Sequence, residues 1–196
     1  DRDKSEFEVL QQGVKLNTEK IAALLQLFRP AAVQKIESIS INETIGKVLR
    51  FFEGQKTAVN FKKIFSDTPL NLACNKTEFS MIIYNLLKNA IQSIRGKGIS
   101  AGEIVISTKI ENKHFVIEIE DNGIGIDKAK TETIFDLGYT TKPDGTGVGL
   151  YFVKKTIENH YDGRIRVSSQ KGKGAVFIIE IPVAINYVLR ADDLWS

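Results

Sequence analysis

Two tight glycine clusters, within residues 121–125 and 145–149, restrict what this chain can fold into more than any other feature. Six of the chain's 15 glycines fall between Gly123 and Gly149. Glycine tolerates positive φ and lets a ligand approach main-chain N–H groups closely. The clusters therefore predict two turns at which the backbone itself meets a ligand.

The flanking sequence assigns each cluster to a different part of a nucleotide. The first cluster follows an alternating run over residues 115–120, which predicts a strand that ends at the carboxylate of Asp121. A buried carboxylate there suits an exocyclic amine such as that of adenine. The second cluster leads into an apolar helical pattern from Leu150, and a helix N-terminus attracts anions through its unpaired N–H groups. Together the two clusters predict a purine nucleotide site.

Two widespread nucleotide-binding folds do not fit these clusters. The dinucleotide fingerprint needs strand, glycine turn and helix in one short unit, and the phosphate loop needs a lysine after its last glycine. Here Gly145 follows a lysine-proline turn rather than a strand, and Leu150 stands where that lysine would be. The nucleotide must therefore be held in a different way.

Composition limits the class of protein. The chain has 196 residues, 42% of them hydrophobic, which predicts one main globular domain plus a small element. Its net charge of +3, from 27 well-mixed basic and 24 acidic residues, gives no reason to expect nucleic-acid binding. The single cysteine, Cys74, fits a reducing compartment, and no apolar run is long enough for a membrane contact. We expect a cytoplasmic location; the first residue is Asp1 rather than Met, so a membrane anchor in a longer protein stays open.

Residues 3–29 read as one helix with a narrow apolar seam. Apart from Asn17, the seam repeats every seven residues through Phe7, Leu10, Val14, Ile21, Leu24 and Phe28. Such a seam is typical of a coiled coil or helical hairpin, and Pro30 marks its end. Residues 1–38 are predicted to be a helical dimerisation and linker segment that forms a homodimer. Packing of the helix on its own domain is the alternative.

The rest of the chain mixes helices and strands without βαβ alternation. Helices are expected from Ile41 to Gly54 and over residues 76–94 and 150–159. Strands are expected over residues 57–65, 71–74, 103–110, 114–120, 164–168 and 175–181. The pattern predicts an α+β sandwich over residues 39–184, with helices on one face of a mixed, mainly antiparallel sheet. Residues 185–196 form a tail without an assigned role.

Asn85 and Asn89 lie four residues apart on the long predicted helix and share one face. Two carboxamides in a region that otherwise packs as core need polar partners. A carboxamide oxygen is a hard ligand, and Mg²⁺ on a nucleotide takes few protein ligands besides phosphate oxygens and water. Without the glycine clusters, a solvent-exposed helix edge would be the better interpretation.

Five motifs in order resemble the catalytic domain of sensor histidine kinases, over about residues 40–183. The N box is similar to residues 85–90, the first glycine box to residues 121–126, and the F box with its lid to residues 135–142. The second glycine box resembles residues 145–150, and the terminal glycine element resembles residues 172–177. The lid sequence Tyr139-Thr140-Thr141-Lys142 is most like the nitrogen-regulator type. The resemblance implies a Bergerat-fold α/β sandwich that binds ATP, with residues 3–29 as the second helix of a dimerisation hairpin.

The resemblance also implies roles for single residues. Asp121 would bond the adenine amino group, Asn89 would hold Mg²⁺, and Asn85 would assist at the phosphates. Lys142 and Lys88 would meet the outer phosphates, and Phe135 would pack the lid, although plain core filling explains Phe135 equally well. The remaining nucleotide contacts would be Gly123, Gly125, Ile126, Thr140, Thr141, Gly145, Thr146, Gly147, Val148, Gly149 and Leu150.

Asn85 bears on the type of reaction. Related ATPases and anti-sigma serine kinases carry a glutamate at this position, and an amide cannot act as a general base at neutral pH. Efficient hydrolysis and transfer to serine are therefore disfavoured, whereas transfer to a nucleophilic imidazole needs less help. Neither His114 nor His160 has the flanking sequence of a phosphoacceptor, so the chain is not expected to phosphorylate itself.

The sequence thus leads to an ATP-binding catalytic domain of a sensor histidine kinase, which is expected to transfer the γ-phosphoryl group to a histidine that is not evident in this chain. Its natural protein partner would be a response regulator. Two alternatives stay open. One is a conformational ATPase of the same superfamily, and the other is a nucleotide-binding regulatory module without autokinase activity.

Overall fold

A computed structural model describes residues 35–54, 59–142 and 145–183. The helix expected over residues 3–29 and the tail from residue 185 lie outside this described part. Within it, no helix is both long and apolar enough to cross a membrane.

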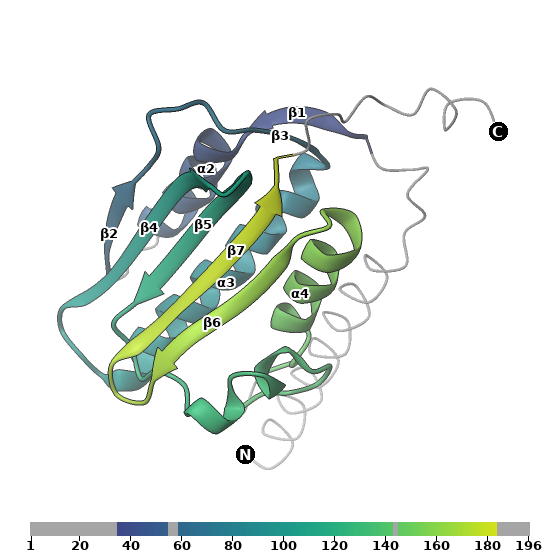
Figure 1. Cartoon of the computed structure of the whole chain (residues 1–196). Helices are drawn as coiled ribbons and strands as arrows, with labels where there is room; N and C mark the ends of the chain where they lie inside the picture. Colours follow the sequence, from purple (N-terminus) through teal and green to yellow (C-terminus); the bar gives the residue numbers. More distant parts are fainter. Residues whose placement is uncertain (1–34, 55–58, 143–144, 184–196) are drawn as a thin grey trace, which may run out of the picture.

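The main sheet has five strands in the order β2-β4-β5-β7-β6 (Figure 1). These strands are β2 (Val59–Ile64), β4 (Gly102–Glu111), β5 (His114–Asp121), β6 (Arg164–Gln170) and β7 (Gly174–Pro182). The β2–β4 pair is parallel, and the three other pairs are antiparallel. The expected mixed, mainly antiparallel sheet is therefore confirmed. Two further strands, β1 (Glu37–Ser40) and β3 (Asn71–Cys74), form a separate antiparallel pair.

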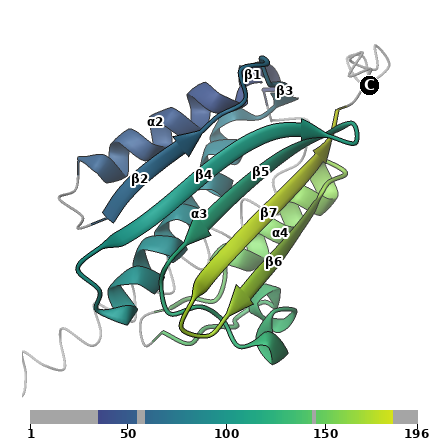
Figure 2. The same cartoon turned by 60° about the vertical axis from the view of Figure 1, so that its left-hand side comes forward.

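Three helices lie on one side of the sheet, as Figures 1 and 2 show from two directions. They are α2 (Ile41–Glu53), α3 (Lys76–Lys97) and α4 (Gly149–His160). Helix α3 packs on β4, β5 and β7, α4 packs on β6, and α2 packs on α3. This one-sided α+β arrangement confirms the expected sandwich.

Local sequence signals explain where the helices begin and end. The Ser40 hydroxyl accepts a hydrogen bond from Glu43 N at 3.3 Å, and Asn75 Oδ1 accepts one from Glu78 N at 2.9 Å. Such caps satisfy main-chain N–H groups that the helix leaves unpaired. Helix α3 runs three residues past its expected end at Ile94 and stops at Gly98, whose φ of 68° suits glycine.

Burial alternates along the strands and places the core between the sheet and the helices. On β5, Phe115, Ile117 and Ile119 are buried against the helices, whereas Glu118 and Glu120 point to the uncovered face, on which Val116 is also buried. Fully burying one such apolar side chain contributes about 2 kcal/mol to folding. The α3 residues that face this layer, from Phe79 to Ile94, fix the height of α3 above the sheet.

The sequence did not indicate two short 3₁₀ helices, η2 (Lys128–Lys130) and η3 (Thr133–Phe135), or the strand β1. Strand β1 has four residues, two of them serines, and its strand conformation depends on pairing with β3. It begins at Glu37, two residues before the expected start of the nucleotide-binding unit at residue 39. The loop joining β4 and β5 lies where it was expected, with Asn112 and Lys113 at φ of 49° and 61°, as in a two-residue hairpin turn.

Candidate nucleotide site

One face of α3 carries three polar side chains at intervals of four residues: Asn85, Asn89 and Ser93. All three are half-buried. At 1.5 Å per residue they span about 12 Å along the helix. Each of them lies against a different segment of the chain, so α3 forms the floor on which the distant motifs meet.

At one end of this floor, Ser93 meets the carboxylate of Asp121 at the end of β5. Asp121 is 3% exposed, and its Oδ1 accepts hydrogen bonds from Ser93 Oγ at 3.0 Å and Gly123 N at 2.8 Å. Among the described residues both bonds fall on Oδ1, which leaves Oδ2 to accept from an incoming amine. Burial raises the pKa of Asp121, while the two hydrogen bonds oppose that rise.

Gly123 makes this close arrangement possible. A Cβ atom at position 123 would lie 2.2 Å from Ser93 Oγ and 2.7 Å from Asp121 Oδ1. Any side chain there would push the helix and the carboxylate apart. The neighbouring Ile126 is half-buried against the core, and its N–H donates to Ser169 Oγ at 2.8 Å. The first glycine cluster thus fixes the carboxylate in place against α3.

At the other end, Asn85 lies beside the N-terminus of α4. A Cβ at Gly149, the first residue of α4, would lie 2.8 Å from Asn85 Oδ1. Asn85 Nδ2 donates to Met81 O at 2.8 Å, so its oxygen is the atom directed at α4. No side chain of the described residues caps this helix end. The N–H groups of the first turn are therefore available to an anion.

Gly147 shapes the turn before α4. Its φ is +65°, and its carbonyl accepts a hydrogen bond from Gly138 N at 3.0 Å. A Cβ at position 147 would lie 2.2 Å from the carbonyl carbon of Gly138. The segment after the F box and the turn before α4 are thus joined backbone to backbone.

Between the two ends, Lys142 reaches the middle of the floor. Its Nζ donates to Asn89 Oδ1 at 3.1 Å and also to Gln92 Oε1. Its main-chain N–H donates to Thr140 Oγ1 at 3.1 Å. Burial, followed by the charge of nearby Lys88, lowers the pKa of Lys142. The structure therefore brings Lys142 to Asn89, with the charge of Lys88 nearby. Their role at the outer phosphates stays a prediction.

The remaining predicted residues surround the same floor. Phe135 is 6% exposed and packs edge-on to Phe177 with ring centroids 6.4 Å apart, so it fills core. A role in packing the lid stays a prediction. Leu150 packs against the core, and Val148 is buried. Gly125 lies against the β6–β7 turn, where a Cβ would meet Gln170 O at 2.1 Å, and Gly145 lies against Thr140, whose Oγ1 a Cβ would meet at 1.9 Å. Thr140 and Thr141 are exposed, and Thr146 is half-buried.

Gln92 was not predicted as a site residue. It follows Asn89 by three positions, so it lies on the same side of α3 and shares the ammonium of Lys142. The spacing was visible in the sequence. The sequence did not show that Lys142, from the predicted lid, would contact Gln92.

The two histidines lie away from this floor. His114 begins β5 and His160 ends α4, whereas Asp121 and Gly149 stand at the opposite ends of the same elements. Along the strand the separation is about 24 Å, and along the helix it is about 16 Å. His114 Nδ1 lies 2.8 Å from Asn112 O, and His160 Nδ1 lies 2.9 Å from Glu78 Oε2. Both histidines therefore lie at a distance from the α3 floor, and that neither is a phosphoacceptor stays a prediction.

The residues fit a nucleotide-borne Mg²⁺ rather than a metal held by protein alone. The described residues contain no cluster of three histidine, cysteine or acidic side chains that could hold a metal ion. Asn89 Oδ1 already accepts a hydrogen bond from a cation, the Lys142 ammonium, so this oxygen lies where a positive charge is stabilised. One carboxamide ligand completed by phosphate oxygens and water is a normal coordination set for Mg²⁺.

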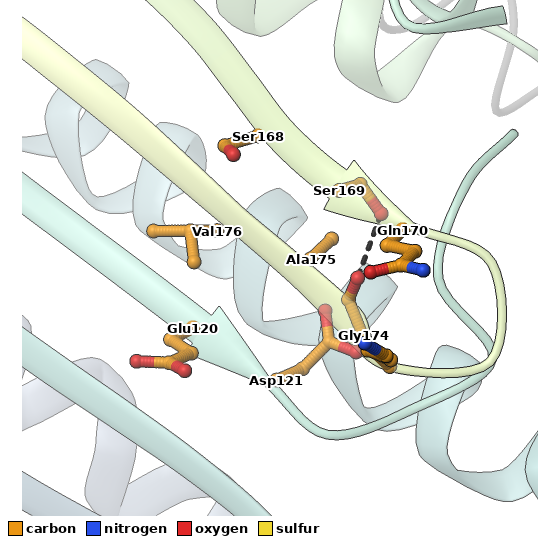
Figure 3. A pocket seen from close by; sticks show the side chains of 9 residues that line it. Glu120, Asp121, Ser168, Ser169, Gln170, Gly174, Ala175 and Val176 are labelled. Carbon is orange, nitrogen blue, oxygen red and sulfur yellow. Dashed lines mark hydrogen bonds between the residues drawn. The ribbon is translucent and has the colours of Figure 1, made fainter. Parts of the chain in front are cut away.

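A shallow hollow on the uncovered face of the sheet is separate from this floor (Figure 3). It lies at the ends of β5, β6 and β7, where Glu120, Ser168 and Val176 face away from the helices. Asp121 also lines the hollow, but its side chain points to the opposite face of the sheet from that of Glu120, because neighbouring residues of a strand alternate in direction. The hollow is therefore not the opening to the Asp121 carboxylate.

Comparison with known proteins agrees with this geometry. Sporulation kinase E of Bacillus subtilis is 30% identical over 95% of this chain and 25% of its own length. The sensor histidine kinase ZraS of Salmonella typhimurium is 32% identical over 83% of this chain and 34% of its own length. The chain thus spans between a quarter and about a third of these relatives.

Solved structures give the same result for the fold. The nucleotide-free catalytic domain of the histidine kinase ThkA is 29% identical and superposes with a TM-score of 0.67, covering 76% of this chain and 96% of that domain. The mycobacterial sensor histidine kinase MprB, 22% identical with a TM-score of 0.66, shows the shared fold alone. Residues 74–185 match the family model described as histidine kinase-, DNA gyrase B- and HSP90-like ATPase. The relatives named here are histidine kinases of this family. This chain belongs to the same ATPase family.

Proposed function

We propose that this chain is the ATP-binding catalytic region of a sensor histidine kinase, which binds Mg·ATP and passes the γ-phosphoryl group to a histidine outside the described residues. The observation that carries the proposal is the α3 floor. Ser93 meets Asp121 at one end, Asn89 meets Lys142 in the middle, and Asn85 meets Gly149 at the other end. A base, a metal with outer phosphates and a phosphate chain can be held along it in that order.

At the base end, Asp121 would accept from the adenine amino group through Oδ2. A buried carboxylate pairs with an amine more strongly than an exposed one, because water does not compete. The Ser93 and Gly123 hydrogen bonds keep the carboxylate oriented before the nucleotide arrives. This pre-ordering supports selection of adenine over a base that carries a carbonyl at the same position.

At the phosphate end, main-chain N–H groups of the α4 first turn and of the second glycine cluster would bind phosphate oxygens. Lys142 and Lys88 supply positive charge, and Asn89 would be the single protein ligand to Mg²⁺. The bound metal would neutralise charge on the outer phosphates. Phosphoryl transfer needs mainly positioning and charge neutralisation, and these residues provide both.

Asn85 favours transfer to an imidazole over hydrolysis. Its oxygen faces α4, and its amide cannot take a proton from water. The conformational-ATPase alternative would require a proton acceptor there. The intact set of Asp121, Asn89 and the glycines argues against a scaffold that keeps the fold but binds no nucleotide. Transfer of label to an acceptor hairpin would distinguish the kinase from a nucleotide-binding regulatory module.

Partners of the full-length protein are part of the proposal. Both histidines lie at the far ends of β5 and α4, so we infer that the acceptor histidine comes from a separate helical hairpin. Dimerisation through residues 3–29 would present that hairpin, and a response regulator would take the phosphoryl group from it. The membership in the kinase-like ATPase family supports these partners and a cytoplasmic site of action. Assignment to the nitrogen-regulator subtype stays a prediction.

Calorimetry with AMPPNP in Mg²⁺, followed by incubation with γ-labelled ATP and a separately supplied acceptor hairpin, tests the proposal. We expect binding, label on the hairpin histidine, and slow phosphate release from the chain alone. Rapid phosphate release would favour the conformational ATPase instead. If the folded chain does not bind AMPPNP, a scaffold that keeps the fold but binds no nucleotide is favoured instead.

A further inference from the structure

The ammonium of Lys142 is held by two carboxamide oxygens of α3, those of Asn89 and Gln92. The two acceptors are three residues apart, so they stand on neighbouring positions of one helix face. All three side chains are half-buried. A segment more than 50 positions away in the chain is thereby tied to the oxygen that Mg²⁺ would need.

Both acceptors are neutral, which makes this tie exchangeable. No salt bridge of the described residues includes Lys142, and the nearby Lys88 adds repulsion. A phosphate is a stronger acceptor for an ammonium than an amide is, because the bond is then between opposite charges. The ammonium is therefore held firmly enough to be placed, and loosely enough to move to an anion.

The ammonium and a metal ion compete for Asn89. An Mg²⁺ ion binds oxygen at about 2.1 Å, so a cation still hydrogen-bonded to the same oxygen would stand within about 5 Å of it. Like charges that close repel strongly in a half-buried site. Occupation of Asn89 Oδ1 by the metal thus requires the ammonium to leave that oxygen.

We propose that Gln92 is a positioning residue that holds Lys142 in place when the metal takes Asn89, and so keeps the lysine beside the outermost phosphate. This inference rests on the proposed function, because it concerns the same nucleotide site. The side-chain oxygens of Asn89 and Gln92 together bind the ammonium, and we call this pair the two-oxygen seat. The metal would take Asn89 Oδ1, and Gln92 Oε1 would still hold the ammonium. The amide at position 92 suits this role, since a carboxylate would repel phosphate and an apolar side chain would release the lysine.

The seat can be tested without nucleotide by timed acetylation of the full chain, read by mass spectrometry. We compare the wild type with Gln92→Leu, and use the exposed Lys128 and Lys173 as internal references. Loss of one hydrogen bond to a charged group should make Lys142 react roughly tenfold faster relative to the references. Gln92→Ala, which keeps the helix favourable, gives a second variant should the leucine not fold. If the acetylation rate of Lys142 is unchanged in a folded variant, Gln92 does not hold the Lys142 ammonium and the two-oxygen seat is overturned.

Nucleotide binding then tests the positioning role. In Gln92→Leu, the preference for AMPPNP over ADP in Mg²⁺ should shrink several-fold, and half-maximal AMPPNP binding should need less Mg²⁺. Lys142→Met should lose the same AMPPNP preference, and the double variant should lose no more. A full preference in Gln92→Leu, with faster acetylation, would overturn the positioning role while the proposed function stands. If the wild type binds neither nucleotide, the proposed function fails. The acetylation result still shows whether Gln92 holds the Lys142 ammonium.

Discussion

Ser93 on α3 and Asp121 at the end of β5 are joined by a 3.0 Å hydrogen bond, with the hydroxyl donating to Oδ1 of the carboxylate. The bond connects the helix layer to the sheet at the buried end of the site. A buried carboxylate with only part of its hydrogen-bonding capacity used is costly to a fold unless a ligand completes it. This cost is the reason to propose Asp121 as a recognition group, and it leads directly to the first prediction.

Asp121→Asn should stabilise the protein and weaken nucleotide binding. Because burial raises the folded-state pKa of Asp121, its carboxyl favours folding most below the ordinary aspartate value of 3.8 and disfavours it once pH rises through the raised pKa. The uncharged variant should therefore gain about 1 kcal/mol in the free energy of unfolding at neutral pH. The gain should disappear in acid. Urea unfolding at pH 7 and at pH 3 checks this.

The same variant should bind AMPPNP roughly 100-fold more weakly, because an amide N–H₂ group can face the adenine amino group in place of an acceptor. Calorimetry measures the change. Ser93→Ala is the matched control. It removes one donor but keeps the carboxylate, so it should cost less affinity than Asp121→Asn. Equal affinity of Asp121→Asn and wild type would remove Asp121 from the site.

Gly147→Ala should disrupt the contact between the Gly138 and Gly147 backbones, an effect beyond the cost of a positive φ at alanine. Gly147 and Gly98 have nearly equal φ, +65° and +68°, but a Cβ at 147 would strike the Gly138 backbone, whereas a Cβ at 98 would meet nothing within 4 Å. Each alanine should bring a conformational cost of about 1–2 kcal/mol. AMPPNP affinity should fall only in Gly147→Ala. Similar affinities for the two variants would show that this backbone contact does not govern binding.

Asn85→Glu should turn the site towards hydrolysis. The new carboxylate would stand beside the N-terminus of α4, where it can take a proton from water. General-base assistance is worth about 100-fold or more, so phosphate release should rise by at least about tenfold even with imperfect placement. A phosphate-release assay with Asn85→Gln as the uncharged control measures this. No increase in a variant that still binds AMPPNP would mean that Asn85 does not face the attacked phosphate.

Glu180→Gln should flatten the acid side of the stability curve. Hydrogen bonds from Arg164, and then from Arg166, lower the pKa of Glu180 on β7, although burial opposes them. A lowered pKa gives stability that is present above the ordinary glutamate value of 4.5 and is lost as pH falls through the folded value. Both arginines are exposed, so the effect should be small and should shrink in high salt. Urea unfolding between pH 3 and 7, at low and high salt, tests it.

Much of the fold could be read from local patterns. The caps Ser40 and Asn75 fixed two helix starts, because a capping side chain bonds N–H groups only three residues away. Alternation along β5 showed which face would be buried. Strand β1 could not be read this way, since its four residues become a strand only through pairing with β3, more than 30 positions later.

By itself the sequence determined the groups of the proposed site: the carboxylate at Asp121, the carboxamides on one helix face, and glycines where side chains would collide. These follow from residue type and short-range spacing, which act within a few residues of the chain. Only the tertiary structure decided that Lys142 sits on Asn89 and Gln92 across 50 or more positions, and that both histidines stand at the far ends of β5 and α4. Such pairings depend on how the sheet and helices pack, and no local pattern specifies which distant side chain will fill a given seat.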